Sequence, residues 1–395
     1  MRKITADYIF PVNAKGDSNP VKEGVIIIDD QGKILAIDQR KDHDSASLEI
    51  HKGVIIPGFI NTHCHLELSH MKGKVDTGTS LIPFISNVVS FRDSPEAEIM
   101  EAIAKADQEM YEGGIVAVGD ISNKIDTKVQ KEKSKINYYT FVEMFDFMQE
   151  SWTEQEYEKY MAVYHEQAGE NGNKKSAVPH APYSVSKTLF QKINELNGEE
   201  ATVSIHNQET PPENELFLQK TGGFLDFYKG FNISLDAFEA TGKTAIHYAL
   251  ENMNPNCKSL FVHNTLTTTT EIEAAQEWSD KVYWATCPNA NLYIENRLPN
   301  YRAFLDTNAK LTIGTDSLTS NWQLSILEEM KTISRFQSYV PFETLLRWAT
   351  LNGAEALAYD DTLGSIEVGK TPGLSLLNLN ENFEMKHDTT VKKLV

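Results

Sequence analysis

The sequence has little cysteine, a deficit of positive charge and no long apolar run. Three cysteines among 395 residues are too few for a disulfide scaffold, so we expect a reducing compartment, the cytoplasm. Lysine and arginine total 37 against 56 aspartate and glutamate residues, and the net charge of −19 would repel a nucleic-acid backbone. No stretch approaches the ~20 apolar residues of a spanning helix, and residues 1–10 lack a signal peptide's apolar core. We therefore expect neither a nucleic-acid nor a membrane partner.

The two ends of the chain share a pattern of short strands. The apolar runs 24–28 and 33–37 flank the turn sequence Asp29-Asp30-Gln31-Gly32, which predicts a hairpin. Residues 363–370 and 374–377 again indicate short strands with glycine turns. We expect the two ends to pair in a small β-sandwich domain.

Between these ends, apolar strands alternate with helical segments, as in parallel βα units. Such units over roughly 300 residues predict an α/β fold of the (β/α)8 TIM-barrel type, and two doubly wound domains are the weaker alternative. The expected domains are residues 1–54 and 359–395 for the two parts of the small β domain, and 55–358 for the barrel. The segment 211–258 is too long for one connecting helix and indicates a helical excursion or a lid. The predicted barrel strands are 54–61, 115–122, 138–145, 177–183, 202–206, 259–263, 282–287 and 310–315.

Polar residues close several of these strands. Active sites of such barrels lie at the carboxyl ends of the strands, so these residues are candidates for catalysis. Five of the chain's 11 histidines fall there, which burial alone gives no reason to expect. The candidates are His63, His65, His180, His206, Glu209, His263 and Asp316.

The residue types suit metal-assisted hydrolysis. His63 and His65 lie two positions apart on a strand and can face one point, while Cys64 faces away. Imidazole and carboxylate ligands fit a zinc-like divalent ion with one position open for water, whose pKa the ion lowers to about 7. A nearby carboxylate must then move the proton. Glu209, three positions after His206, is our candidate, and a solvated surface glutamate is the alternative.

Four motifs resemble the amidohydrolase superfamily, in particular its mononuclear deaminase branch of cytosine, guanine and adenosine-type deaminases. They are Pro57-Gly58-Phe59-Ile60-Asn61-Thr62-His63-Cys64-His65, Ser204-Ile205-His206-Asn207-Gln208-Glu209, Val262-His263-Asn264 and Gly314-Thr315-Asp316-Ser317. The resemblance implies that one metal is bound by His63, His65, His206 and Asp316.

The same resemblance implies roles for the other candidates. Glu209 would shuttle a proton to a ring nitrogen, His263 with Asp316 would orient and deprotonate the attacking water, and His180 would face the substrate. Binuclear relatives carry a bridging lysine where this chain has His180, so we expect one ion. We expect this ion to be Zn²⁺, with Fe²⁺ or Mn²⁺ as alternatives.

The implied reaction is hydrolytic deamination, in which hydroxide bound to the metal attacks a purine nucleoside-type substrate and ammonia is released. Residues 66–73 and 287–299 look most like aminodeoxyfutalosine deaminases of a menaquinone route. Other deaminases, acting on guanine, cytosine, adenosine or S-adenosylhomocysteine, and triazine chlorohydrolase-like enzymes are the alternatives. A catalytically silent barrel that serves as an assembly module is the alternative of a different class.

For two residues near the expected site, the sequence allows two interpretations each. Glu67 would accept hydrogen bonds from ribose hydroxyls or orient a metal ligand. Arg297 would meet an anionic end of the substrate or, as we prefer, form an ion pair on the loop surface. The resemblance also makes a homodimer or a larger homo-oligomer plausible.

Overall fold

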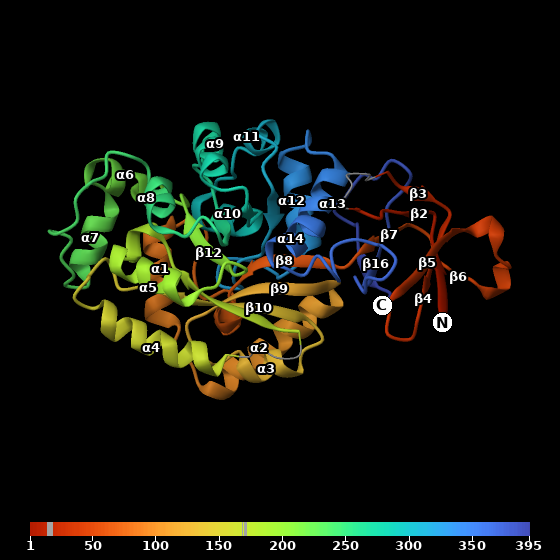
Figure 1. Ribbon diagram of the computed structural model, residues 1–395, viewed down its shortest axis with the longest axis horizontal. Coiled ribbons are helices and arrows are strands. Elements are labelled where there is room, and N and C mark those ends of the chain that lie inside the picture. Colours follow the sequence, from red (N-terminus) through yellow and green to blue (C-terminus); the bar gives the residue numbers. More distant parts are fainter. Residues whose placement is uncertain (14–18, 168, 170–171) are drawn as a thin grey trace.

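Parallel strands form the centre of the molecule (Figure 1). The computed structural model describes residues 1–13, 19–167, 169 and 172–395, and within them two four-stranded parallel sheets carry the barrel-type strands. In spatial order, the first contains β11 (Lys174–Pro179), β10 (Asn137–Met144), β9 (Ile115–Ser122) and β8 (Phe59–Cys64). The second contains β12 (Thr202–Asn207), β13 (Lys258–His263), β14 (Val282–Thr286) and β15 (Leu311–Ile313).

The two sheets adjoin at both edges. At one edge the backbone N–H of His206 donates to the carbonyl oxygen of His180 at 2.9 Å. At the other edge, the N–H groups of Thr315 and Asp316 donate to the carbonyl oxygen of His63 at 3.0 and 2.9 Å. The carboxyl ends of both sheets therefore meet, and the predicted α/β alternation with parallel strands is confirmed.

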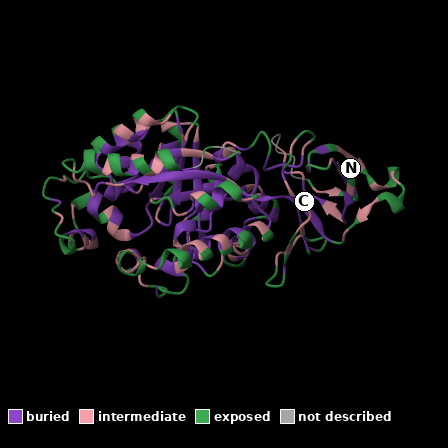
Figure 2. Cartoon of the chain, turned by 90° about the horizontal axis from the view of Figure 1, so that it is seen from below, coloured by how far each residue is buried: buried purple, intermediate pink, exposed green. Residues whose placement is uncertain are grey.

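Helices cover the strands on their outer side. Figure 2 shows buried strands inside and helices whose outer faces are exposed. The helix α5, for example, buries Leu189, Phe190 and Ile193 on one face and is capped by Ser186, whose hydroxyl accepts the Leu189 N–H. The covering helices are α2 (Glu96–Glu112), α3 (Lys128–Lys133), α4 (Thr153–Glu166), α5 (Lys187–Leu196), α9 (Thr269–Trp278), α11 (Tyr301–Asp306), α12 (Ile326–Phe336), α13 (Phe342–Ala349) and α14 (Leu351–Ala356).

Further helices follow the carboxyl ends of the strands. The segment 211–258 is a helical excursion that contains α6 (Pro211–Gln219), α7 (Gly223–Gly230) and α8 (Ala245–Asn252) before β13 begins. The helix α1 (Leu81–Phe91) contacts both α7 and α10 (Pro288–Glu295). Among the described helices, none combines the length and apolar character that crossing a bilayer requires.

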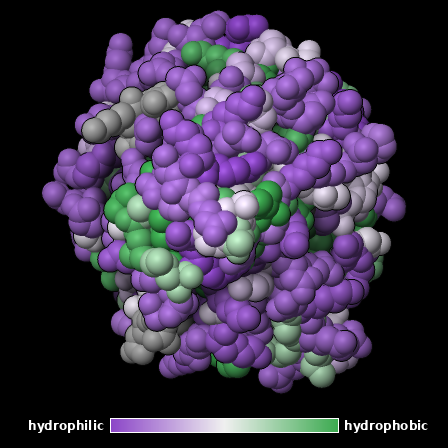
Figure 3. Space-filling model, turned by 90° about the vertical axis from the view of Figure 1, so that its right-hand side faces the viewer, coloured by the Kyte–Doolittle hydropathy of each residue, from purple (hydrophilic) through white to green (hydrophobic). Residues whose placement is uncertain are grey.

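The chain ends build two small sheets beside the barrel-type strands (Figure 1). Ile4, Ile26 and Ile34 of the first sheet share a core with Ile55 and Leu374. The expected pairing of the ends is confirmed because the strands at residues 374–377 and 391–393 share one sheet with the strands at residues 8–9 and 21–22. Seen from this end, the molecule is largely hydrophilic (Figure 3). The sheet orders are β5 (Ile34–Gln39), β4 (Gly24–Ile28), β1 (Arg2–Thr5) and β6 (Glu49–Ile50); and β17 (Val391–Lys393), β16 (Leu374–Leu377), β7 (Val54–Pro57), β2 (Tyr8–Ile9) and β3 (Val21–Lys22).

Two strand predictions are corrected. The predicted strand 54–61 is two strands in different sheets, β7 and β8, separated at Gly58. A Cβ atom at Gly58 would lie 2.4 Å from Val116 Cγ1 and 2.8 Å from the Pro372 carbonyl oxygen, so only glycine fits this crossing. Residues 363–370 form turns instead of a strand, although Ile366 N–H still donates to the Pro11 carbonyl oxygen at 2.8 Å.

Candidate active site

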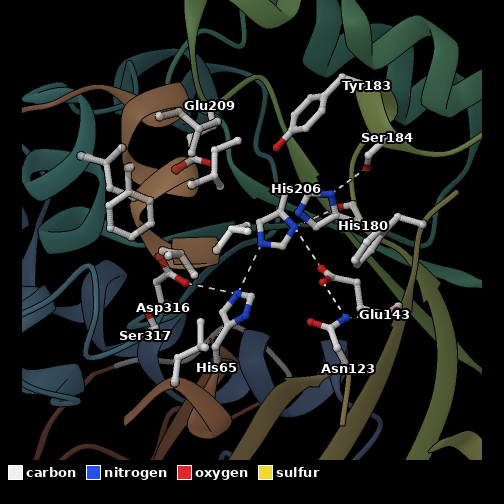
Figure 4. A pocket seen from close by; sticks show the side chains of 18 of the residues that line it. His65, Asn123, Glu143, His180, Tyr183, Ser184, His206, Glu209, Asp316 and Ser317 are labelled. Atoms are coloured by element: carbon white, nitrogen blue, oxygen red, sulfur yellow. Dashed lines mark hydrogen bonds and ion pairs between the residues drawn. The ribbon is translucent and has the colours of Figure 1, made fainter. Parts of the chain in front are cut away.

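Three imidazoles and one carboxylate converge where the carboxyl ends of β8, β12 and β15 meet, and Figure 4 shows His65, His206 and Asp316 of this group. His65 Nε2 lies 3.2 Å from His63 Nε2 and 3.4 Å from His206 Nε2. Asp316 Oδ1 lies 3.3 Å from His65 Nε2 and 3.5 Å from His63 Nε2. We call His63, His65, His206 and Asp316 the histidine–aspartate cluster.

The other sequence candidates border this cluster. His263 closes β13, and its Nε2 lies 3.7 Å from Glu209 Oε2. His180 follows β11 and lines the same cavity, with its Nδ1 2.7 Å from Ser184 Oγ. The structure thus brings all seven candidates together, from strands far apart in the sequence.

The backbone is unusual at two of these residues. His263 and Asp316 have φ angles of 72° and 57°, in the left-handed region that side chains with a Cβ rarely adopt. Such conformations persist where the surroundings fix them and concentrate at functional sites. The side chains are fixed as well, since Asn291 Oδ1 lies 2.9 Å from His263 Nδ1, and Ser320 Oγ donates to Asp316 Oδ2 at 2.6 Å.

The protonation states within the cluster suit metal binding. Burial lowers the pKa values of His63, His65 and His263 to about 4, so these imidazoles are neutral at pH 7. Burial opposes ionisation of Asp316, but contacts with His63 and the other histidines hold its pKa well below the ordinary value. At His206 burial is outweighed by Glu143, which raises the pKa to about 9. A metal ion at this residue therefore competes with a proton.

The cluster fits a divalent ion. Zn–N bonds of 2.0–2.1 Å in a tetrahedral site place neighbouring ligand atoms about 3.3 Å apart, and the four distances given above are close to this value. The nitrogens that face one another are neutral at two of the three histidines, and the carboxylate is ionised. The ligand atoms of His63, His65 and His206 all lie within 4.8 Å of one another, as do those of His63, His263 and Asp316, so each trio can hold a metal ion.

Glu209 is the buried carboxylate next to the cluster. Its side chain is 4% exposed, and Oε1 finds no hydrogen-bond partner among the described residues. Burial is the main cause that raises the pKa of Glu209 to about 8; His206 opposes this shift, and Asp316 contributes to it. Glu209 therefore holds a proton at neutral pH in the metal-free protein.

The cavity has a polar floor and an apolar outer wall. It measures about 260 Å³ and reaches from the cluster to the helices α1 and α7. The apolar wall is formed by Leu81, Phe84, Ile85, Val88, Val89, Phe145, Phe147, Phe227, Tyr228 and Ile294. The cavity therefore suits a ligand with a polar end near the cluster and an apolar end near the mouth.

Sequence reasoning missed three polar residues of the wall: Asn123, Glu143 and Arg92. Glu143 was detectable as the one charged residue in the apolar predicted strand 138–145. Burial opposes its ionisation, but His180 and His206 hold the pKa of this carboxyl well below the ordinary value. Arg92 follows α1, outside any strand end, so the search for strand ends could not find it.

The structure shows the surroundings of Glu67 and Arg297, for which the sequence allows two interpretations each. Glu67 accepts backbone N–H groups of Asn123 and Lys124 at 3.0 and 3.1 Å and pairs with Arg92 at 3.3 Å. Its oxygens are thus occupied by the protein itself. Arg297 is exposed on the loop after α10.

Comparison with known proteins agrees with this architecture. Residues 54–395 match the model of the Amidohydrolase family. Adenosine deaminase of Helicobacter pylori is 28% identical over 395 residues, spanning 96% of this chain and 92% of that protein. The crystal structure of Helicobacter pylori aminofutalosine deaminase in complex with methylthio-coformycin has a TM-score of 0.80 at 23% identity, covering 97% of this chain and 94% of that one.

A second solved structure contains zinc. Atrazine chlorohydrolase TrzN from Arthrobacter aurescens, complexed with zinc, has a TM-score of 0.76 at 17% identity and covers 96% of this chain and 88% of that one. At these identities the two structural likenesses show a shared TIM-type fold alone. The family match covers most of the chain, and the resemblance seen in its motifs is confirmed: this protein belongs to the amidohydrolase family.

Proposed function

We propose that this protein is a metal-dependent hydrolase of C–N bonds that deaminates a purine nucleoside-type substrate and releases ammonia. One observation supports the proposal: the histidine–aspartate cluster offers ligand groups that can hold a metal ion, and the buried Glu209, whose pKa is raised to about 8, lies beside it. Relatives with deaminase names support it, since the Helicobacter pylori protein is an adenosine deaminase and a Bacillus cereus relative, 26% identical, is a 5-methylthioadenosine/S-adenosylhomocysteine deaminase.

We assign one divalent ion, Zn²⁺, to His63, His65, His206 and Asp316. When bound, such an ion makes water nucleophilic at neutral pH by lowering its pKa. The zinc in the triazine enzyme supports the choice of metal.

The side chains of the protein then transfer the protons and orient the water and the substrate. Glu209 holds a proton at neutral pH and delivers it from its carboxyl group to the ring nitrogen next to the amine-bearing carbon. His263, which is neutral, and Asp316, which is ionised, orient the attacking water and accept its proton. His180 presents its Nε2 to the substrate, because Nδ1 is engaged by Ser184. The proton accepted from the water passes to the amine, the carbon–nitrogen bond breaks and ammonia leaves, while the proton of the added hydroxyl group returns to Glu209.

The shape of the cavity supports a specific substrate, aminodeoxyfutalosine. Adenosine would leave the apolar wall on α1 and α7 unfilled, whereas an aryl group on the sugar would bury it. Arg92, the cation in this wall, lies where an anionic group on that aryl end would meet it. The name of the Helicobacter pylori aminofutalosine deaminase points to the same substrate, and with it to menaquinone synthesis.

We also propose the closure of the barrel, the form of the small domain and the cellular compartment of the protein. The hydrogen bonds at both sheet edges support one closed (β/α)8 barrel over residues 55–358. The shared core of the two small sheets supports a β-sandwich from residues 1–54 and 359–395. Three buried free cysteines are consistent with a reducing cytoplasm.

An ammonia-release assay on metal-loaded protein tests the function. The panel is aminodeoxyfutalosine, adenosine, S-adenosylhomocysteine, 5′-methylthioadenosine, guanine and cytosine. We expect the highest kcat/KM with aminodeoxyfutalosine. A preference for another nucleoside would correct the substrate, and silence across the panel with metal bound would overturn deamination.

A further inference from the structure

Asn291 contacts His263 through both ends of its side-chain amide. The residue is buried on α10, and its Oδ1 lies 2.9 Å from His263 Nδ1. Its Nδ2 donates to the backbone carbonyl oxygen of His263 at 3.4 Å. One side chain thus holds both the imidazole and the left-handed backbone of the same histidine, whose φ is 72°.

The backbone contact decides which way the amide of Asn291 faces. A carbonyl oxygen can only accept a hydrogen bond, so the NH2 group is the end that faces the backbone of His263. The amide oxygen then faces His263 Nδ1, and this oxygen can also only accept. Nδ1 is therefore the ring nitrogen that bears hydrogen. Because a neutral imidazole carries one N–H, Nε2 keeps a lone pair and cannot donate.

The second ring nitrogen of His263 faces the site. His263 lines the cavity, and its Nε2 lies 3.7 Å from Glu209 Oε2. A nitrogen without hydrogen at this position can accept a hydrogen bond, and then a proton, from the attacking water. The other tautomer would direct an N–H at that water and could take no proton from it. The tautomer therefore decides whether His263 can act as a base.

The position of Asn291 is itself fixed by the protein. The backbone N–H of Asn291 donates to the Cys287 carbonyl oxygen at 2.8 Å. Two residues earlier, Asn289 donates its backbone N–H and its Nδ2 to the buried carboxylate of Glu329 at 2.8 and 3.0 Å. These bonds hold the first turn of α10, so the amide of Asn291 meets His263 in one orientation.

We propose that Asn291 is a positioning residue that holds His263 in the tautomer with hydrogen on Nδ1, so that Nε2 accepts the proton of the attacking water. Asn291 is not among the described residues that line the cavity, so it acts through His263 and does not touch the substrate. The inference deepens the proposed deamination and rests on it for the task of His263. The tautomer itself can be measured without any substrate.

The tautomer is measured by ¹⁵N NMR of the zinc-loaded protein, because ring nitrogens with and without hydrogen resonate in separate regions of the spectrum. The signals of His263 are identified by their absence from His263→Gln. We expect hydrogen on Nδ1 and a bare Nε2 in the wild type. Hydrogen on Nε2 would overturn the inference without any variant of Asn291.

Two variants of Asn291 separate positioning from support of the fold. Asn291→Leu removes the acceptor, so part of the population should carry hydrogen on Nε2, and kcat should fall at least about tenfold with KM and metal content nearly unchanged. Asn291→Asp keeps an acceptor opposite Nδ1, so it should keep the wild-type tautomer and recover most of the lost kcat. Equal losses of kcat in both variants, with the wild-type tautomer in both, would overturn the inference.

Tyr293→Phe is the matched control on the same helix. The hydroxyl of Tyr293 donates to the Val75 carbonyl oxygen at 2.5 Å, so this variant removes a hydrogen bond of α10 without changing a contact of His263. It should keep the wild-type tautomer and kcat. An unaltered kcat in Asn291→Leu would overturn the role of Asn291. Absence of ammonia from every nucleoside would instead overturn the proposed deamination, and the NMR spectrum would still decide the tautomer.

Discussion

The carboxylate of Glu213 holds the backbone of Glu209. Glu213 Oε2 accepts the N–H of Glu209 at 3.1 Å, and Oε1 accepts the N–H of Gln208 at 2.9 Å. Gln208 has a φ of 46°, so this turn is a left-handed one that needs such support. The first turn of α6 therefore decides where the proposed proton-carrying side chain points.

Replacing Glu213 by glutamine tests this support. The glutamine amide has the same shape, but its NH2 group is a donor and faces one of the two backbone N–H groups. One of the two hydrogen bonds that hold the turn is therefore lost. We expect kcat to fall about tenfold or more, with KM and metal content nearly unchanged. The control is Glu215→Gln on the exposed side of the same helix, which should behave as wild type. An unaltered kcat in Glu213→Gln would contradict the positioning role.

Glu209→Gln tests the proton transfer itself. Glutamine retains the shape but cannot release a proton, so turnover should drop by at least about a hundredfold. Elemental analysis should still find the wild-type metal content, because Glu209 is outside the histidine–aspartate cluster. Near-normal turnover would remove Glu209 from the mechanism.

The stability of the metal-free protein should respond to the titration of Glu209. Its pKa is about 8 in the folded chain against an ordinary 4.5, so the folded state binds the proton more tightly than the unfolded state. The resulting stabilisation is complete below the ordinary pKa and is lost as the pH rises through about 8. In urea unfolding, Glu209→Gln should therefore gain stability relative to wild type between about pH 5 and pH 8. A difference that stays constant with pH would refute the raised pKa.

The apolar wall should discriminate between nucleosides. Phe227 lines the cavity, whereas Phe231, one turn further on, is 48% exposed. Phe227→Ala should reduce kcat/KM for aminodeoxyfutalosine by about tenfold, the scale of a lost aromatic contact, and leave adenosine nearly unaffected. Phe231→Ala is the matched control. Equal losses with both nucleosides would show that Phe227 supports the fold and does not contact the aryl group.

The strand ends explain why so much of the site was predictable. His63, His206 and His263 lie on buried parallel strands, and the carboxyl ends of such strands meet in space. A polar residue there is visible in the sequence because apolar residues precede it. Similar reasoning identified Glu209 and Asp316.

The supporting residues escaped prediction for a different reason. Glu213 reaches back from a helix to a turn, and Arg92 enters the cavity wall after α1; both positions depend on tertiary packing and leave no periodic signal. The break at Gly58 was also hidden, since Val116 and Pro372 crowd it from distant parts of the chain. The pattern of neighbouring residues in the sequence does not reveal contacts between distant parts of the chain.

The most direct measurement counts ammonia against nucleoside consumed, using metal-loaded wild-type protein and its His206→Ala variant with their metal contents determined in parallel. We predict one ammonia for each 6-amino nucleoside converted to its 6-oxo form in the wild type, and loss of both metal and turnover in the variant. Conversion without ammonia, or full turnover by a variant that has lost its metal, would contradict metal-dependent deamination at this site.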